Sequence, residues 1–200
     1  MIDKNMKLTP HLASPSKATL SHSNKFDGLR LTPHFTLGEM VASKSHPEIN
    51  NVPTEPQIMN LITVCQWLEK LREEYNRRYV FRGESREERE ERIVQRQTKG
   101  ESIPEEPIVI NSGFRSKMLN YVVGGEQDSN HLTGCAADIR CKDCTQAVRY
   151  AALLIELFQK AKKDWDEIII EKKSSKGRTF WVHFAVRPER NRCKVTCITL

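Results

Sequence analysis

The chain has 200 residues, of which 38% are hydrophobic and 29% charged, and its net charge is +6. This composition is ordinary for one soluble globular domain and requires no second one. No run of about 18 apolar residues is present, so the sequence predicts no membrane span. The excess of positive charge would favour contact with an anionic polymer, either nucleic acid or an acidic cell wall.

The N-terminal segment differs in composition from the rest of the chain. Residues 1–30 are polar and show neither helical nor alternating apolar periodicity, which predicts a disordered tail. Residues 31–200 should then form a single domain with a charged insertion at about 77–106. Because Met1–Leu20 lacks the continuous apolar stretch of a signal peptide, we expect the chain to be cytoplasmic as synthesised.

Two helices are expected before the insertion. Thr36 and Glu39 form a capping box for a short helical turn within His34–Met40. Thr54 and Gln57 form another at the start of a long helix. Apolar residues at helical spacing predict one buried stripe on that helix, with Trp67 outside it: Ile58, Leu61, Ile62, Cys65, Leu68, Leu71 and Tyr75.

The insertion at about 77–106 is a run of mixed charges with too few apolar residues to bury a face. We expect a solvated helical arm with ion pairs between residues i and i+4. A partner-binding arm is the alternative. The mixed signs argue against a nucleic-acid-binding arm, which would be mostly positive.

The second half of the chain combines strands with two helices. The expected strands are 108–110, 136–141, 167–173, 179–187 and 193–198. The expected helices are Met118–Val123 and 145–162, the latter with this inner face: Val148, Ala151, Ala152, Ile155 and Phe158. These elements predict an α+β fold in which helices pack on a small, largely antiparallel sheet.

Six cysteines in a chain without a visible export signal indicate reduced thiols. Two spacings leave alternatives open. Cys141 and Cys144 together with Cys193 and Cys197 could form a four-thiolate zinc site, because each short spacing lets two sulfurs converge on one ion. A disulfide between the two pairs is the other possibility.

One ten-residue segment carries the clearest chemical pattern. It places His131 and Asp138 on either side of Gly134, and His183 follows on a strand whose apolar residues face the other way. Two histidines and one carboxylate leave the fourth position of a tetrahedral zinc open, as in catalytic sites. Spacing alone leaves two interpretations of the glycine: it makes room for a substrate beside the ion together with Ala136, or it only turns the chain into the strand.

The same segment belongs to a longer set of motifs. The set comprises Ser112-Gly113-Phe114-Arg115-Ser116, Leu119-Asn120, Val123-Gly124-Gly125, Ser129-x-His131-x-x-Gly134-x-Ala136-x-Asp138 and Trp181-Val182-His183. Spanning roughly His34 to Val186, it resembles the M15 family of zinc D-Ala-D-Ala carboxypeptidases and related peptidoglycan peptidases, and most closely its subfamily A. The resemblance implies that His131, Asp138 and His183 bind Zn²⁺. It also implies that Arg115 binds the substrate or polarises its carbonyl oxygen, although Arg115 could equally lock its loop to the sheet.

The general base departs from the family pattern. Some relatives carry an acidic residue two or three positions before the last histidine, where this chain has Trp181 and Phe180. We expect Glu171 to serve instead, because a five-residue loop between the strands would pair it with Trp181 and leave it diagonal to His183 on the same face. A four-residue loop would put Glu171 on the other face. Asp166 is the alternative base, and a Glu171 without a catalytic role also stays open.

Two more polar residues precede His131. Gln127 and Ser129 are candidates for orienting ligands or substrate, although a serine at this position commonly forms a local turn with its hydroxyl. Cys135 is expected to belong to the core.

The sequence thus predicts a monomeric zinc peptidase that hydrolyses peptidoglycan stem peptides or cross-links, as a D-Ala-D-Ala carboxypeptidase or a murein endopeptidase. It would reach the cell wall by release or delivery along an unknown route. Two alternatives remain: a non-catalytic, zinc-containing cell-wall-binding module, and a basic nucleic-acid-associated protein that uses the cysteine cluster.

Overall fold

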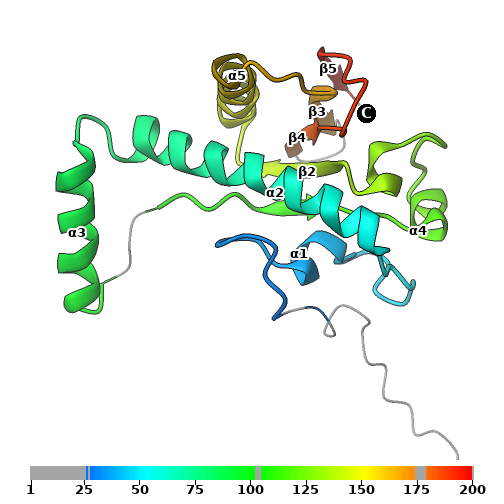
Figure 1. Ribbon diagram of the computed structural model, residues 1–200, viewed down its shortest axis with the longest axis horizontal. Helices are drawn as coiled ribbons and strands as arrows, with labels where there is room; N and C mark the ends of the chain where they lie inside the picture. The colour runs from blue at the N-terminus through cyan, green and yellow to red at the C-terminus, as the bar shows by residue number, and fades with distance from the viewer. Residues whose placement is uncertain (1–25, 27, 102–104, 174–178, 200) are drawn as a thin grey trace, which may run out of the picture.

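Five strands form one sheet in the computed structural model, which describes residues 26, 28–101, 105–173 and 179–199 (Figure 1). The strands are β1 (Ile110–Ser112), β2 (Ala136–Cys141), β3 (Glu167–Lys173), β4 (Thr179–Ala185) and β5 (Lys194–Thr199). Their order is β1-β2-β4-β3-β5, and only the β3–β5 pair is parallel. The predicted mixture of helices with a largely antiparallel sheet is confirmed. The first strand begins at Ile110, two residues later than predicted.

The helices begin where the sequence places capping residues. They are α1 (Leu37–Val41), α2 (Glu55–Tyr75), a π-helical turn (Asn76–Val80), α3 (Arg86–Thr98), α4 (Lys117–Val122), the 3₁₀ helix η3 (Asn130–Thr133) and α5 (Cys144–Ala161). Both predicted capping boxes are present, at Thr36 with Glu39 and at Thr54 with Gln57. None of the helices in the described part of the chain is long and apolar enough to span a membrane.

The two faces of the sheet have different roles. Alternation along β2 and β4 sends Ile139, Val182 and Phe184 into the core, where α2 and α5 pack. Figure 1 shows α2 crossing this side of the molecule, and α5 packs against β3 and β4. The opposite face carries Asp138 and His183, so the helical layer supports the strands without covering these two side chains.

The buried face of α2 is broader than the predicted stripe. Trp67, expected outside it, is only 8% exposed because its ring stacks on Phe158 of α5 at 3.7 Å between centroids. Val64 is buried as well, whereas Ile58 and Ile62 are only half-buried. The prediction was wrong here because α2 packs against two neighbours, α5 and the sheet. A single apolar stripe predicts packing against only one neighbour.

The predicted inner face of α5 was also partly wrong. Val148 is 50% exposed, and Ala152 is exposed too. The helix instead buries Ala147, Tyr150, Ala151, Leu153, Leu154 and Phe158. Tyr150 packs edge-on against Tyr75 of α2, with ring centroids 4.8 Å apart, so this face of α5 lies against α2.

The charged segment forms the exposed helix α3, which Figure 1 shows beyond one end of α2. Arg86 and Glu90 make the expected i to i+4 ion pair at 2.8 Å. Helix α3 also contacts the segments on either side of it. Arg89 pairs with Glu105 at 3.0 Å and packs over the ring of Phe81.

Two predicted features fall largely or wholly outside the described residues. They are the tail, of which only 26 and 28–30 are described, and the loop 174–178. Phe26 packs against the core and its carbonyl accepts a hydrogen bond from the amide of Gly38 at 3.2 Å, so contacts with the domain begin before residue 30.

Candidate metal centre

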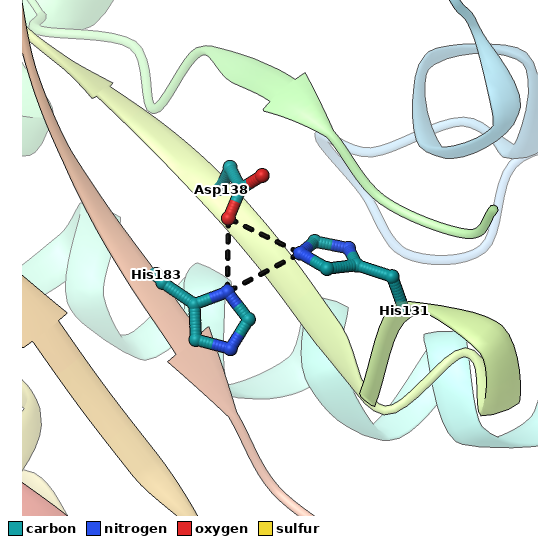
Figure 2. Close-up of side chains that lie close together, drawn as sticks. All are labelled: His131, Asp138 and His183. Atoms are coloured by element: carbon teal, nitrogen blue, oxygen red, sulfur yellow. Dashed lines mark hydrogen bonds and ion pairs between the residues drawn. The ribbon is translucent and has the colours of Figure 1, made fainter. Parts of the chain in front are cut away.

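Three side chains converge on the face of the sheet opposite α2 and α5, as Figure 2 shows. Oδ1 of Asp138 lies 2.9 Å from Nδ1 of His183 and 3.2 Å from Nε2 of His131. The two imidazole nitrogens are 3.2 Å apart. All three side chains are buried, and among the described residues they form the only group of this kind that could hold a metal ion.

Strand pairing fixes two of these residues. Asp138 on β2 and His183 on β4 are direct cross-strand partners, so their side chains leave the sheet side by side. His131 reaches the same point from η3, just before β2. The predicted ligands, which span more than fifty positions of sequence, are therefore brought together by one antiparallel pairing and one short turn.

The turn that carries His131 is anchored to α2. Side-chain amides of Gln57 and Asn60 donate to the carbonyls of Leu132 and Thr133, each at 2.9 Å. Gly134 ends the turn with φ +73°, and a Cβ there would lie 2.5 Å from the carbonyl oxygen of Gln57. The glycine is thus required by the turn and its packing on α2, which supports the second interpretation of this position.

The outer nitrogens of both imidazoles have acceptors. Nδ1 of His131 donates to the carbonyl of Gly113 at 2.5 Å, and Nε2 of His183 lies 3.6 Å from Oε2 of Glu167. With protons on these outer nitrogens, the inner nitrogens direct lone pairs toward Asp138. In that state three electron-pair donors face one another within about 3 Å, and a bound cation would relieve their mutual repulsion.

The pKa shifts of the three side chains indicate where charge is favoured in the centre. Burial lowers the pKa of His131. Burial would also lower the pKa of His183, but hydrogen bonds with Asp138 and Glu167 outweigh it and raise that pKa to about 9. Burial opposes ionisation of Asp138 too, yet the two histidines hold its pKa well below the usual value. The centre therefore favours an ionised carboxylate with positive charge beside it.

The donor set fits zinc. Zn–N and Zn–O bonds of about 2.1 Å at tetrahedral angles place ligand atoms about 3.4 Å apart. The observed separations of 2.9 to 3.2 Å are close to this value. Nitrogen and oxygen donors on three protein ligands also match catalytic zinc sites, in which a fourth position is open to water.

Arg115 lies on the other side of the carboxylate. Its Nη2 donates to Oδ2 of Asp138 at 2.5 Å, and its Nε donates to the hydroxyl of Ser112 at 2.8 Å. Its backbone amide also donates to the carbonyl of His131 at 3.1 Å. Arg115 therefore fixes Asp138 and ties its loop to both the sheet and η3, while its guanidinium borders the centre.

Glu171 lies in the register that a five-residue loop predicts. It pairs with Trp181, and the adjacent pair on the same face is Ile169 with His183. Burial raises the pKa of Glu171, and the negative charge of Asp138 adds to this effect. A hydrogen bond with the Trp181 side chain acts in the opposite direction.

The other candidates have different surroundings. Asp166 is fully buried and accepts two hydrogen bonds from Arg192, at 2.9 and 2.7 Å, which leaves it in an ion pair rather than at the centre. The hydroxyl of Ser129 accepts from the amide of His131 at 3.3 Å, the local turn that was the alternative to a substrate role. Gln127 is exposed and lines a hollow beside η3 together with Ser129.

Sequence reasoning missed the residues behind the ligands. Buried Asn130 donates to Asp166 at 2.7 Å and to Glu167 at 3.1 Å, which joins the His131 turn to β3. Lys194 in turn pairs with Glu167 at 3.1 Å. Asn130 could have been identified from the sequence because it is next to His131. No local sequence pattern identifies Glu167 or the carbonyl of Gly113 as partners of the histidines.

The cysteines do not assemble into the four-thiolate site. Cys141 is on β2 and Cys197 on β5, with β4 and β3 between them. Three interstrand steps of about 4.8 Å separate these strands by about 14 Å, too far for a shared ion. All six cysteines are free thiols.

Comparison with known families agrees with this geometry. The sequence model of the family described as Peptidase M15 matches residues 86–156, less than half of the chain. The match begins within the charged segment, includes Arg115, His131 and Asp138, and ends before His183. It supports the M15 family and, with it, a metallopeptidase. A search of curated proteins found no match.

Proposed function

We propose that this chain is a zinc-dependent peptidase that hydrolyses peptide bonds in peptidoglycan stem peptides or cross-links. The observation that carries the proposal is the convergence of three lone-pair donors from His131, Asp138 and His183 on one point. The zinc would be held by Nε2 of His131, Oδ1 of Asp138 and Nδ1 of His183. Bound zinc supplies a water of pKa about 7 and polarises the scissile carbonyl.

Arg115 has two roles in this proposal. It orients Asp138 through the hydrogen bond at 2.5 Å. It also presents a permanent positive charge beside the centre, which stabilises the negative charge that develops on the carbonyl oxygen during attack. The half-buried position of the guanidinium favours this second role, because screening by water is reduced there.

Glu171 is the proposed general base. Its burial raises its pKa toward neutrality, which makes the carboxylate a better proton acceptor than an exposed glutamate. It would take a proton from the attacking water and pass it to the leaving amine. The ion pair of Asp166 with Arg192 disfavours Asp166 for this task.

The peptidoglycan substrate rests on the family resemblance, and the monomeric state is likewise a proposal. A non-catalytic wall-binding module is less favoured, since an acidic residue shares the face of the centre despite the missing acid before His183. The separation of the cysteines likewise disfavours the alternative based on a cysteine cluster.

Mass spectrometry of muropeptides tests the proposal. Zinc-loaded protein is incubated with purified peptidoglycan and with soluble peptides ending in D-Ala-D-Ala, and the products identify the bond cleaved. We expect new peptide ends with the wild type and none with His131→Ala. Intact substrates after incubation with fully zinc-loaded wild type would refute the enzymatic proposal and favour the binding module.

A further inference from the structure

Arg140 lies on the same face of the sheet as the metal centre. It follows Asp138 by two positions on β2, so both side chains leave the strand on the same side. Two residues of strand span about 6.8 Å, which places Arg140 one side-chain repeat from Asp138. Unlike Asp138, Arg140 is exposed to solvent.

The guanidinium of Arg140 has a neutral partner. Its Nε donates to Oδ1 of Asn111 at 3.0 Å. No carboxylate in the described part of the chain forms an ion pair with it, whereas Arg115 pairs with Asp138, and Arg192 pairs with Asp166 and Glu167. Anchoring at Nε restrains the side chain and leaves the two terminal nitrogens for a guest. That edge of an arginine can meet a carboxylate through two parallel hydrogen bonds.

The neighbours of Arg140 separate it from the proposed base. Arg140 pairs across the sheet with Trp181, and Trp181 pairs with Glu171 on its other side. The half-buried indole thus stands between the cation and the acid, so Glu171 does not neutralise Arg140. A guest anion at Arg140 would occupy the β2 side of the centre, and the proton acceptor the β3 side.

On the basis of the proposed function, we infer that Arg140 binds the free C-terminal carboxylate of a peptide whose last bond is cleaved at the centre. One extended residue spans at most about 3.6 Å, and a charge-assisted contact to its carboxylate adds about 2.8 Å. The backbone repeat between Asp138 and Arg140 has a similar length. Arg115 is bonded to Asp138 and Ser112 and is assigned to the carbonyl oxygen in the proposed function, so recognition of the carboxylate is assigned to Arg140. The substrate class is then a peptide with a free carboxyl end, which is carboxypeptidase action.

Equilibrium binding separates this inference from turnover. The probes are an N-acetylated tripeptide ending in D-Ala-D-Ala and its C-terminal amide, titrated calorimetrically into zinc-loaded Glu171→Gln protein. We expect the acid to bind at least about tenfold more tightly than the amide, as for a hydrogen bond between charged groups. Arg140→Gln in the same background should remove this preference. Arg140→Lys should keep only part of it, because lysine retains the positive charge but not the paired N–H donors of a guanidinium.

The matched control is Arg86→Gln, which removes the same charge from an exposed position on α3. It should leave the preference for the acid unchanged. Equal binding of acid and amide before Arg140 is altered, or the same preference after Arg140→Gln, would overturn the inference. Hydrolysis by the wild type is measured separately: if neither peptide is cleaved, the proposed enzyme activity fails, while the binding comparison still decides the role of Arg140.

Discussion

Asp138 and His183 are direct partners across β2 and β4, with Oδ1 and Nδ1 of their side chains 2.9 Å apart. Their separation is set by the sheet, whereas His131 depends on a turn that α2 holds in place. The positions of Asp138 and His183 are therefore fixed by the sheet, and the position of His131 is fixed by the contact between η3 and α2.

Replacement of any ligand should abolish zinc binding. His131→Ala, Asp138→Ala and His183→Ala each remove one donor from the three, and we expect bound zinc to fall from about one ion per chain to none under chelator competition. Elemental analysis of dialysed protein measures this. Wild type stripped by a chelator should also melt at a lower temperature, because zinc bound to the folded state stabilises it.

His46→Ala is the control for that series, since His46 lies in the loop after α1 and contacts Glu48 rather than the centre. Its zinc content should equal that of the wild type. Full zinc content in a double variant lacking His131 and His183 would show that the ion is bound elsewhere.

Glu171→Gln should retain zinc but lose activity. Loss of a general base lowers kcat by about 10² to 10⁴-fold. The base must be ionised, so the kcat/KM of the wild type should fall as the pH drops through the pKa of Glu171, which burial raises above the ordinary value of about 4.3. The variant should lack this acid limb in a pH profile of hydrolysis.

Glu91→Gln, on the exposed face of α3, provides the comparison for this loss of one carboxylate. Its pH profile should match that of the wild type. An unchanged acid limb in Glu171→Gln would assign the ionisation to another group and remove Glu171 from the mechanism.

The sequence predicted what depends on local periodicity and loop length. A loop of five residues is enough to pair Glu171 with Trp181, and alternation then decides the face of His183. Partners from distant segments left no such pattern. Trp67 was misplaced because only the packing of α2 on α5 buries it, and Glu167 could not be connected with His183 without knowing how β3 and β4 pair.

Thiol reactivity should divide the cysteines into two groups. Cys144, Cys193 and Cys197 are exposed, whereas Cys65, Cys135 and Cys141 are buried. Burial also raises the pKa of Cys65 and Cys141 to about 12, which leaves little reactive thiolate at neutral pH. A colorimetric thiol reagent should label about three groups quickly in native protein and about six after unfolding. Protection of Cys144, Cys193 and Cys197 by zinc would instead indicate a thiolate site.

Gly134→Ala should destabilise the protein and weaken zinc binding together. A side chain at φ +73° costs about 1 to 2 kcal/mol, and the approach of its Cβ to within 2.5 Å of the Gln57 carbonyl adds about 1 to 3 kcal/mol of overpacking. Relief of that clash moves η3 away from α2 and takes His131 with it. Urea denaturation and zinc affinity measure the two effects.

Gly100→Ala separates strain from clash. Gly100 has a similar φ of +68°, but a Cβ there would meet nothing within 4 Å, so only the backbone term applies. We expect Gly100→Ala to lose about 1 to 2 kcal/mol of stability with unchanged zinc affinity. If Gly134→Ala lost no more stability than Gly100→Ala and bound zinc equally well, the contact with Gln57 would not be what positions His131. The difference between the two alanine variants thus measures how strongly α2 controls the third ligand.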